Sequence, residues 1–264
     1  MILSRSPTAR AVMARARRDD VRVCLDSETD LLAYYFAGHR VVGVNTRLSE
    51  AGRIVFLAHE LAHVPQHPRY SDNRYYPADD LLLLRRVREA AAEAIATRIA
   101  WELRRAGYEA VWHEKRKSAY GDVARAFIAA LTLPSLRAPS PGHGHDPATE
   151  ADMMRATRAA FDQWFAARWR RNVYDAMTID HLERIAADRI GLVPPRQSLS
   201  HEFLAGIAWV GTGNFILATG GRRLTDPVYA GTVSRRNARR LARLINRALS
   251  WRAADELAMV GLSA

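Results

Sequence analysis

Three short stretches near the N-terminus distribute their apolar residues in the way that β-strands do. Residues 21–25 alternate along the chain, 31–36 are rich in aromatic side chains, and 40–45 follow a turn at Gly38 and contain three valines. Alternation and enrichment in β-branched and aromatic residues are typical of strands. The pattern therefore predicts a small sheet built from these three stretches.

After the third stretch the apolar residues recur every three or four positions, which is the period of an amphipathic helix. Ser49 is a suitable cap for this helix, and Pro65 disfavours its continuation beyond Val64. A longer helix is expected over 79–105. Further helices are expected over 109–131, 148–170, 173–190, 199–210 and 232–258. Residues 215–219, which lie between glycine-containing turns, are interpreted as a short β-hairpin.

The composition divides the chain into four parts. Residues 1–20 form a basic leader without the apolar run of roughly 7–15 residues that a secretory signal needs. Residues 21–133 combine strands with helices, 134–148 are dense in Pro, Gly and Ser and predict a linker, and 149–264 predict a helical C-terminal unit. We expect an α+β fold that is predominantly helical. The default location is cytoplasmic, although a protein secreted without a signal would look the same.

Composition excludes several classes of protein. No apolar run approaches the roughly 18 residues needed to cross a bilayer, so no membrane span is expected. Cys24 is the only cysteine, which leaves no internal disulfide. For the same reason a Cys-rich zinc finger and an iron–sulfur protein are excluded.

The chain is strongly basic, with 39 Lys and Arg residues against 28 Asp and Glu residues and a net charge of +11. Lys115 and Lys117 are its only lysines, and such a bias toward arginine also follows from a GC-rich coding sequence. One predicted C-terminal helix carries a series of arginines: Arg235, Arg236, Arg239, Arg240, Arg243 and Arg247. This face is compatible with nucleic acid, anionic lipid or an acidic partner, but a solvated face of an amphipathic helix is the favoured explanation.

One motif carries recognisable chemistry, the run His59-Glu60-Leu-Ala-His63. On a helix the two histidines are four residues apart, so both imidazoles leave the same face and can reach one zinc ion. Glu60 lies beside them, where a carboxylate can take a proton from metal-bound water. The longer metzincin pattern is not met, because Gln66 and Arg69 occupy its glycine and third histidine positions.

A third zinc ligand is expected from the following helix. Glu89 lies there with Glu93 four residues later, so both share a face, and the alanines around them leave space. We assign Glu89 as the ligand. Glu93 is expected to accept a hydrogen bond from the far nitrogen of a zinc-bound histidine, which fixes its tautomer. Glu93 itself and His67 remain alternatives for the third ligand.

These residues together resemble the gluzincin branch of the zincin metallopeptidases, which bind zinc through His, His and Glu. More narrowly, residues 20–105 are similar to a bacterial family that is assigned to the metallopeptidases on this motif alone and whose substrate is unknown. The resemblance implies a zincin-like domain over 21–133, with a small sheet whose edge strand, here 40–45, aligns an extended substrate beside the motif helix. The related pattern usually has Asp where this chain has Glu93.

The function that we expect is zinc-dependent hydrolysis of peptide bonds, with a metal-activated water, Glu60 as general base and a peptide or protein as substrate. The alternative is a basic helical module that binds nucleic acid or a protein partner and has a structural or vestigial zinc site. A structural site is normally closed by four protein ligands, which favours the enzyme. The sequence fixes neither the substrate nor the oligomeric state. Nor does it rank the candidates for stabilising the oxyanion: Tyr75, Tyr76, His113, Tyr120 and His201.

Overall fold

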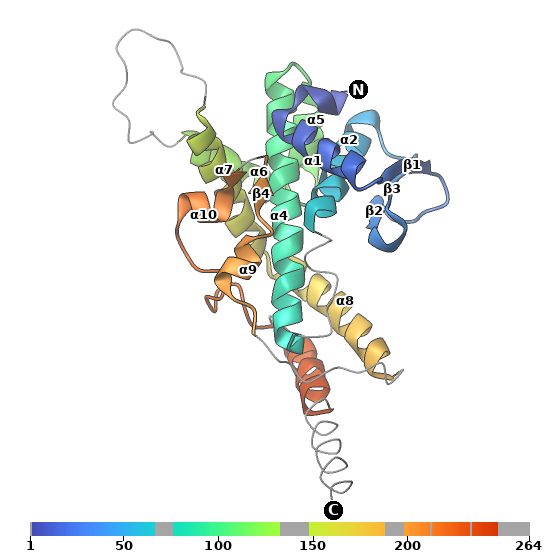
Figure 1. Ribbon diagram of the computed structural model, residues 1–264, viewed down its shortest axis with the longest axis vertical. Coiled ribbons are helices and arrows are strands. Elements are labelled where there is room, and N and C mark those ends of the chain that lie inside the picture. Colours follow the sequence, from blue (N-terminus) through green and yellow to red (C-terminus); the bar gives the residue numbers. More distant parts are fainter. Residues whose placement is uncertain are drawn as a thin grey trace, which may run out of the picture. The chain divides into compact units, whose positions relative to one another are not determined.

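The computed structural model describes residues 2–66, 76–132, 148–187, 198–211, 213–232 and 234–247 (Figure 1). Helices predominate over these residues and two small sheets accompany them, which confirms the α+β, predominantly helical class. Within the described ranges, no helix is both long enough and apolar enough to cross a membrane.

The chain forms two compact units, each assembled from separate stretches. Unit 1 comprises Met1–Arg69, Arg88–Ala166 and Ala205–Gly221, and unit 2 comprises Tyr70–Val87, Ala167–Leu204 and Arg222–Ala264. Helix α4, Ala78–Arg105, contributes residues to both units. Of the predicted linker, only Ala148 lies within the described residues.

The basic N-terminal segment belongs to unit 1 and packs within it. Ser6 caps helix α1, Pro7–Arg18, by accepting a hydrogen bond from the third helical amide. The hydroxyls of Ser6 and Thr8 both donate to the carboxylate of Glu102 in α4, at 2.5 and 2.7 Å. The cap and these two long-range hydrogen bonds fix the position of the segment.

A three-stranded sheet follows α1, and its strands form where the alternation predicts them. Strands β1, Arg22–Asp26, β2, Ala33–Phe36, and β3, Val41–Asn45, lie in the order β1-β3-β2. β3 pairs in parallel with β1 and antiparallel with β2. The expectation that 40–45 forms the edge strand is therefore wrong. β3 is almost wholly buried, which suits a strand in the interior of a sheet.

Helix α2, Glu50–His63, packs on β2 and β3 of this sheet. Ser49 caps it, and a 3-10 turn, Val64–Gln66, follows at Pro65, so the predicted helix and its end are confirmed. The face toward the sheet and the neighbouring helices consists of small and aliphatic residues: Val55, Ala58, Leu61 and Ala62.

The helices after α4 differ from the predicted ones where the chain breaks or turns. The stretch 109–131 forms two helices, α5, Glu109–Lys117, and α6, Gly121–Thr132. A side chain at Gly121 would place its Cβ 2.3 Å from the carbonyl oxygen of Arg116, so only glycine fits the turn between them. The next helices, α7 and α8, span Glu150–Ala166 and Arg168–Ala187.

The C-terminal third contains a short second sheet. Strands β4, Trp209–Val210, and β5, Gly213–Asn214, pair antiparallel, and α9, His201–Ala205, precedes them. The predicted hairpin at 215–219 is wrong, because these residues form helix α10, Phe215–Thr219. The side chain of Asn214 accepts hydrogen bonds from two amides of its first turn and so starts a helix. Residues 235–247 are also helical.

Candidate metal centre

Helix α2 presents the motif histidines on one face. His59 and His63 are one turn apart near the end of the helix, where their side chains are 13% and 10% exposed. Glu60, between them, is partly exposed. Among the described residues, none forms a hydrogen bond to the Glu60 carboxylate, which leaves it accessible to water.

Helix α4 places Glu89 and Glu93 opposite these histidines. Both glutamates are buried, with only 4% and 2% of their surface exposed. Ala90, Ala91 and Ala92, which lie between them, are fully buried and small enough to let the helices approach. Two carboxylates therefore lie in an interior formed largely by methyl groups, where charge is costly unless it is paired.

Three side-chain atoms from these helices converge on one point. Nε2 of His59 lies 3.2 Å from Nε2 of His63, and each lies 3.6 Å from Oε2 of Glu89. Ligands at about 2.0–2.1 Å from a tetrahedral zinc ion are separated from one another by about 3.3–3.4 Å. The triangle that the three atoms form is therefore of the size that a single bound ion requires, and the donor set fits zinc.

Hydrogen bonds on the far side of each imidazole direct its Nε2 toward this point. Nδ1 of His59 lies 3.1 Å from Oε2 of Glu93, and Nδ1 of His63 lies 2.8 Å from Oε1 of Gln66. The Gln66 amide nitrogen donates to the carbonyl of Arg88, so its oxygen must face His63. Each Nδ1 therefore carries the proton, and each Nε2 offers its lone pair to a metal.

A buried lysine compensates the charge of Glu93. Lys115 of α5 is 1% exposed, and its ammonium forms an ion pair with Oε1 of Glu93. Burial alone would raise the pKa of Glu93, but Lys115 and the hydrogen bond from His59 outweigh it, and the pKa falls below its usual value. Glu93 is consequently ionised, and Lys115, Glu93 and His59 form a continuous chain of polar contacts.

The surrounding carboxylates make the site strongly negative. Burial lowers the pKa of His59, but hydrogen bonds to Glu89 and Glu93 and the charge of Glu60 raise it to about 10. The same negative potential that stabilises an imidazolium also stabilises a metal cation.

Lys115 and Gln66 were not predicted from the sequence as site residues. Gln66 was noted only because it occupies the glycine position of the metzincin pattern. Lys115 has a weak signal in the composition, because it is one of two lysines beside 37 arginines. The compact ammonium group of lysine suits a buried point contact better than a guanidinium does.

None of the other predicted candidates that the structure describes belongs to the group of His59, His63 and Glu89. His67 and Tyr75 lie outside the described residues. The Nδ1 of His201 accepts a hydrogen bond from the amide of Leu224 within unit 2, while Tyr120 lies against Lys115, with the ammonium 5.8 Å from its ring centroid. His113 is exposed on α5.

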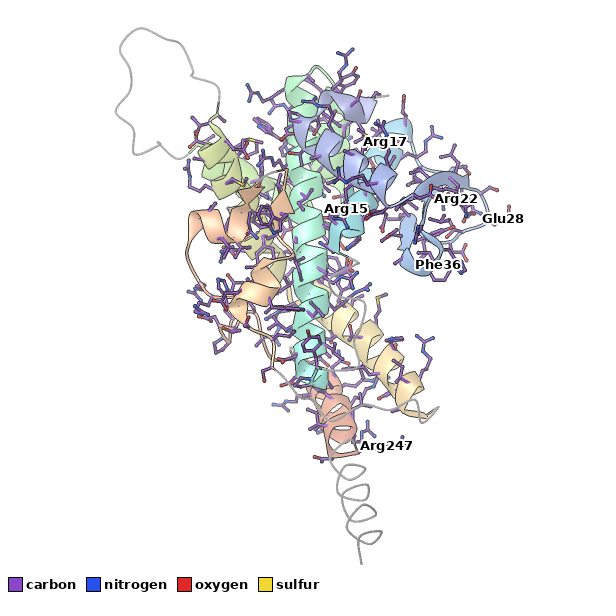
Figure 2. The ribbon with its side chains drawn as sticks, viewed as in Figure 1. Arg15, Arg17, Arg22, Glu28, Phe36 and Arg247 are labelled. Atoms are coloured by element: carbon purple, nitrogen blue, oxygen red, sulfur yellow. The ribbon has the colours of Figure 1, made fainter. Side chains whose placement is uncertain are left out.

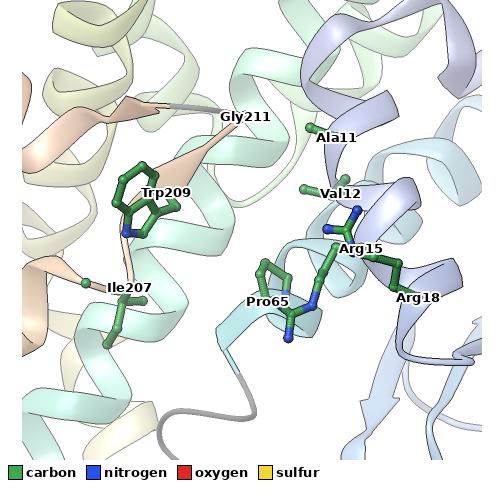
Figure 3. Close-up of a pocket in the computed structure, with 9 residues that line it drawn as sticks. Ala11, Val12, Arg15, Arg18, Pro65, Ile207, Trp209 and Gly211 are labelled. Atoms are coloured by element: carbon green, nitrogen blue, oxygen red, sulfur yellow. The ribbon is translucent and has the colours of Figure 1, made fainter.

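A pocket of about 290 Å³ begins where the motif helix ends (Figure 3). Pro65, two residues beyond His63, forms part of its wall, together with Arg15 and Arg18 of α1. Trp209 of β4, which is 43% exposed, lines the opposite side. The pocket therefore combines positive charge with an aromatic surface.

Comparison with known proteins identifies a family but no individual relative. The family described as "Putative metallopeptidase family (DUF6782)" matches residues 1–216, and the chain belongs to this family. No curated protein and no solved structure matches the chain significantly. The family description indicates an enzyme that uses a metal, in agreement with the group of His59, His63 and Glu89.

Proposed function

We propose that this protein is a zinc-dependent metallopeptidase of the gluzincin type, with His59, His63 and Glu89 as its zinc ligands. The observation that carries the proposal is the convergence of their three donor atoms, at separations of 3.2 to 3.6 Å, between α2 and α4. The family description supports the reaction class.

The choice of zinc rests on the donor set. Two neutral imidazoles and one carboxylate are the ligands of catalytic zinc sites, which keep a fourth position open. Zinc held there would lower the pKa of a water molecule toward 7 and polarise the carbonyl of the scissile bond. Harder ions such as magnesium and calcium prefer all-oxygen sites and are disfavoured by the two histidines.

Glu60 is proposed to act as the general base. Its carboxylate adjoins the zinc ligands on α2 and is partly exposed, so it can accept a proton from the attacking water. The same carboxyl group then returns the proton to the nitrogen of the departing amine. Glu93 and Gln66 hold the two imidazoles in the required tautomer throughout.

The pocket at the end of the motif helix provides a place for a substrate side chain. Because Arg15 and Arg18 line it, we expect it to favour an acidic residue of a peptide. Arg15 is already paired with Asp19 at 2.7 Å, so Arg18 is the arginine whose charge should matter more. Replacing Arg18 by Ala should reduce the preference for acidic peptides in a library, whereas Arg17→Ala, on the same helix but outside the pocket lining, should not.

Two features separate this proposal from a binding module with a structural zinc site. A structural site normally has four protein ligands, whereas the described residues contribute three. Glu60 also has no structural partner among the described residues, as a proton-transfer group requires.

The experiment that tests the proposal compares wild type with Glu60→Gln. Both proteins should bind one zinc per chain by elemental analysis, while hydrolysis of a peptide library or casein should fall by about 10²–10⁴-fold in the variant. Glu50→Gln, in the first turn of the same helix, is the matched control and should retain full activity. A wild type that binds no zinc, or an active Glu60→Gln variant, would refute the proposal.

A further inference from the structure

Strand β1 is an edge of the first sheet, and its side chains are exposed along most of its length. Arg22, Val23, Cys24 and Leu25 are all exposed, and the two aliphatic residues among them, Val23 and Leu25, are exposed by 51% and 62%. Natural proteins usually protect such an edge with charge, proline or a covering element, because its unpaired backbone can pair with another strand. Figure 2 shows Arg22 at this side of the sheet.

The pairing of β1 with β3 determines which backbone groups remain available. The amide of Arg22 donates to the carbonyl of Arg40 at 2.8 Å, and the carbonyl of Asp26 accepts from the amide of Thr46 at 3.1 Å. Backbone groups alternate in direction along a strand, so residues 22, 24 and 26 bond toward β3. The N–H and C=O groups of Val23 and Leu25 therefore point to the open edge.

The side chains of the same two residues extend the apolar face of the sheet beyond the part on which α2 packs. Val23 and Leu25 are in register with Val42 and Val44 of β3, so all four side chains lie on one face. Val42 and Val44 are at most 1% exposed, because α2 packs on β2 and β3. The apolar layer thus continues past the region that α2 covers.

We propose that β1 pairs antiparallel with β1 of a second copy of this chain, across a two-fold axis at Cys24. Val23 of each copy then lies opposite Leu25 of the other and exchanges both backbone hydrogen bonds with it. The two three-stranded sheets join into one of six strands, and the exposed aliphatic pairs extend the apolar layer across the junction. Such an interface is isologous, as closed dimers require.

The charged residues at the two ends of β1 favour a second copy of β1 as the partner and favour this pairing register. With the axis at Cys24, Arg22 of one copy lies opposite Asp26 of the other, so two opposite-charge pairs flank the centre. An axis at Val23 would place Arg22 opposite Cys24, and an axis at Leu25 would place Asp26 opposite Cys24, so either shift removes the two opposite-charge pairs from the strand. Asp26 is negatively charged, since the amide of Glu28 and the hydroxyl of Tyr34 hold its pKa below the usual value.

The register also places the two Cys24 residues directly opposite each other. They form a pair without mutual backbone hydrogen bonds, whose Cα atoms lie about 4.5 Å apart. This separation is within the range of about 4.4–6.8 Å that a disulfide spans. A mild oxidant such as diamide, which takes up two hydrogens as two thiols join, should therefore cross-link the dimer through Cys24.

The test measures molecular mass by light scattering and sedimentation as the protein concentration is raised. A short strand pair buries less than a standard interface, so we expect a monomer–dimer equilibrium in the micromolar range. Val23→Pro removes an amide that points to the edge and not to β3, so the variant should fold, bind metal and remain monomeric. Leu217→Lys, at a 55% exposed leucine on α10, is the control and should dimerise like wild type.

Cross-linking provides the independent readout. Diamide should convert wild type, but not Cys24→Ser, into a disulfide-linked dimer, and Val23→Pro should suppress the product. A wild type that stays monomeric at hundred-micromolar concentration, or a Val23→Pro variant that dimerises equally, would overturn the proposal. Neither measurement depends on zinc or on peptidase activity, so this inference can fail while the proposed function stands.

Discussion

Helix α4 carries two buried clusters of charge, three residues apart, that are built in opposite ways. Arg86 belongs to a cluster in unit 2, and Glu89 belongs to the candidate metal centre in unit 1. Both residues are nearly inaccessible, with 1% and 4% of their surface exposed. Both regions therefore bury a charged side chain of α4 to a similar extent, and they differ in the sign of the charge and in the arrangement of its partners.

In the Arg86 cluster, the hydrogen-bond donors and the charge of the guanidinium are matched by partners within the cluster. The guanidinium donates from Nε and Nη2 to the two oxygens of Asp175, at 2.7 and 2.6 Å, and from Nη1 to the carbonyl of Tyr229 at 2.9 Å. Donors face acceptors at every contact, and the charges cancel. Such a bidentate buried pair is structural, and it offers no group to a ligand.

In the Glu89 cluster, donors and acceptors are not matched one to one in this way. The Nδ1–H groups of the two histidines donate to Glu93 and Gln66 on the far side of each ring. The groups that converge on the near side, the two Nε2 atoms and the Glu89 carboxylate, can therefore share only a proton or a cation. The comparison teaches that converging acceptors, rather than buried charge in general, indicate a cation site.

The largest expected effect is the loss of metal when a converging donor is removed. His63→Ala should reduce zinc from about one ion per chain to nearly none, because two remaining ligands cannot hold the ion firmly. Elemental analysis after dialysis measures the zinc content per chain, and Asp175→Ala is the control that should keep its metal. If His63→Ala retained zinc while His59→Ala and Glu89→Ala also did, the converging atoms would not be the ligands.

The next effect concerns stability rather than metal. Asp175→Ala leaves Arg86 as an unpaired buried charge and should lower the free energy of unfolding by about 3–5 kcal/mol. Thermal and denaturant unfolding of the chelated protein measure this change. The double variant Arg86→Met with Asp175→Leu should recover most of the loss, since apolar residues of similar volume replace such pairs well. If the double variant recovered none of the lost free energy of unfolding, the ion pair would have a role beyond neutralising its own buried charges.

A smaller effect is expected from the groups behind the histidines. Gln66→Leu keeps the size of the side chain but removes both the acceptor for His63 and the donor to Arg88, so zinc affinity should fall about 10–100-fold. Competition with a chromophoric chelator gives the affinity. Gln163→Leu, which removes a hydrogen bond to Asp122 elsewhere in unit 1, is the control. Equal affinities for the two variants would exclude a role for Gln66 in positioning His63.

The smallest effect is the proton released when zinc binds. In the chelated protein His59 has a pKa raised from 6.5 to about 10, so its contribution to stability is full below pH 6.5 and is lost as the pH rises through about 10. Zinc requires the neutral ring, so binding at pH 8 should release a proton, and less should be released near pH 10. Calorimetry in buffers of different ionisation enthalpy counts the protons released. The same count at pH 8 and near pH 10 would contradict the raised pKa of His59.

The motif and its second helix could be predicted because their information is local. A spacing of four places His59 beside His63 and Glu89 beside Glu93 on any regular helix, and the alanines around the glutamates mark a buried face. The three strands and the end of α2 at Pro65 were also predictable from alternation and from proline chemistry. The assignment of zinc ligands remains a prediction that the structure makes geometrically reasonable.

The remaining features depend on tertiary packing. Lys115 reaches Glu93 only because α5 folds back against the site, and no local pattern encodes that contact. The strand order depends on which strands pair with one another in the folded sheet, so the interior position of β3 was missed. The helix at 215–219 was missed because its cap, Asn214, directly follows two glycines, Gly211 and Gly213, whose spacing is typical of a turn.

The assembly of unit 1 from three separated stretches sets the order of events during synthesis. The residues of the candidate metal centre leave the ribosome early, but the last stretch of the unit ends at Gly221, roughly 130 residues after Glu93. At about 5–20 residues per second, this is an interval of roughly 6–26 seconds. During that time the converging histidines and glutamate belong to a nascent chain in which unit 1 is still incomplete, so the site cannot have its final surroundings until the last stretch has been made.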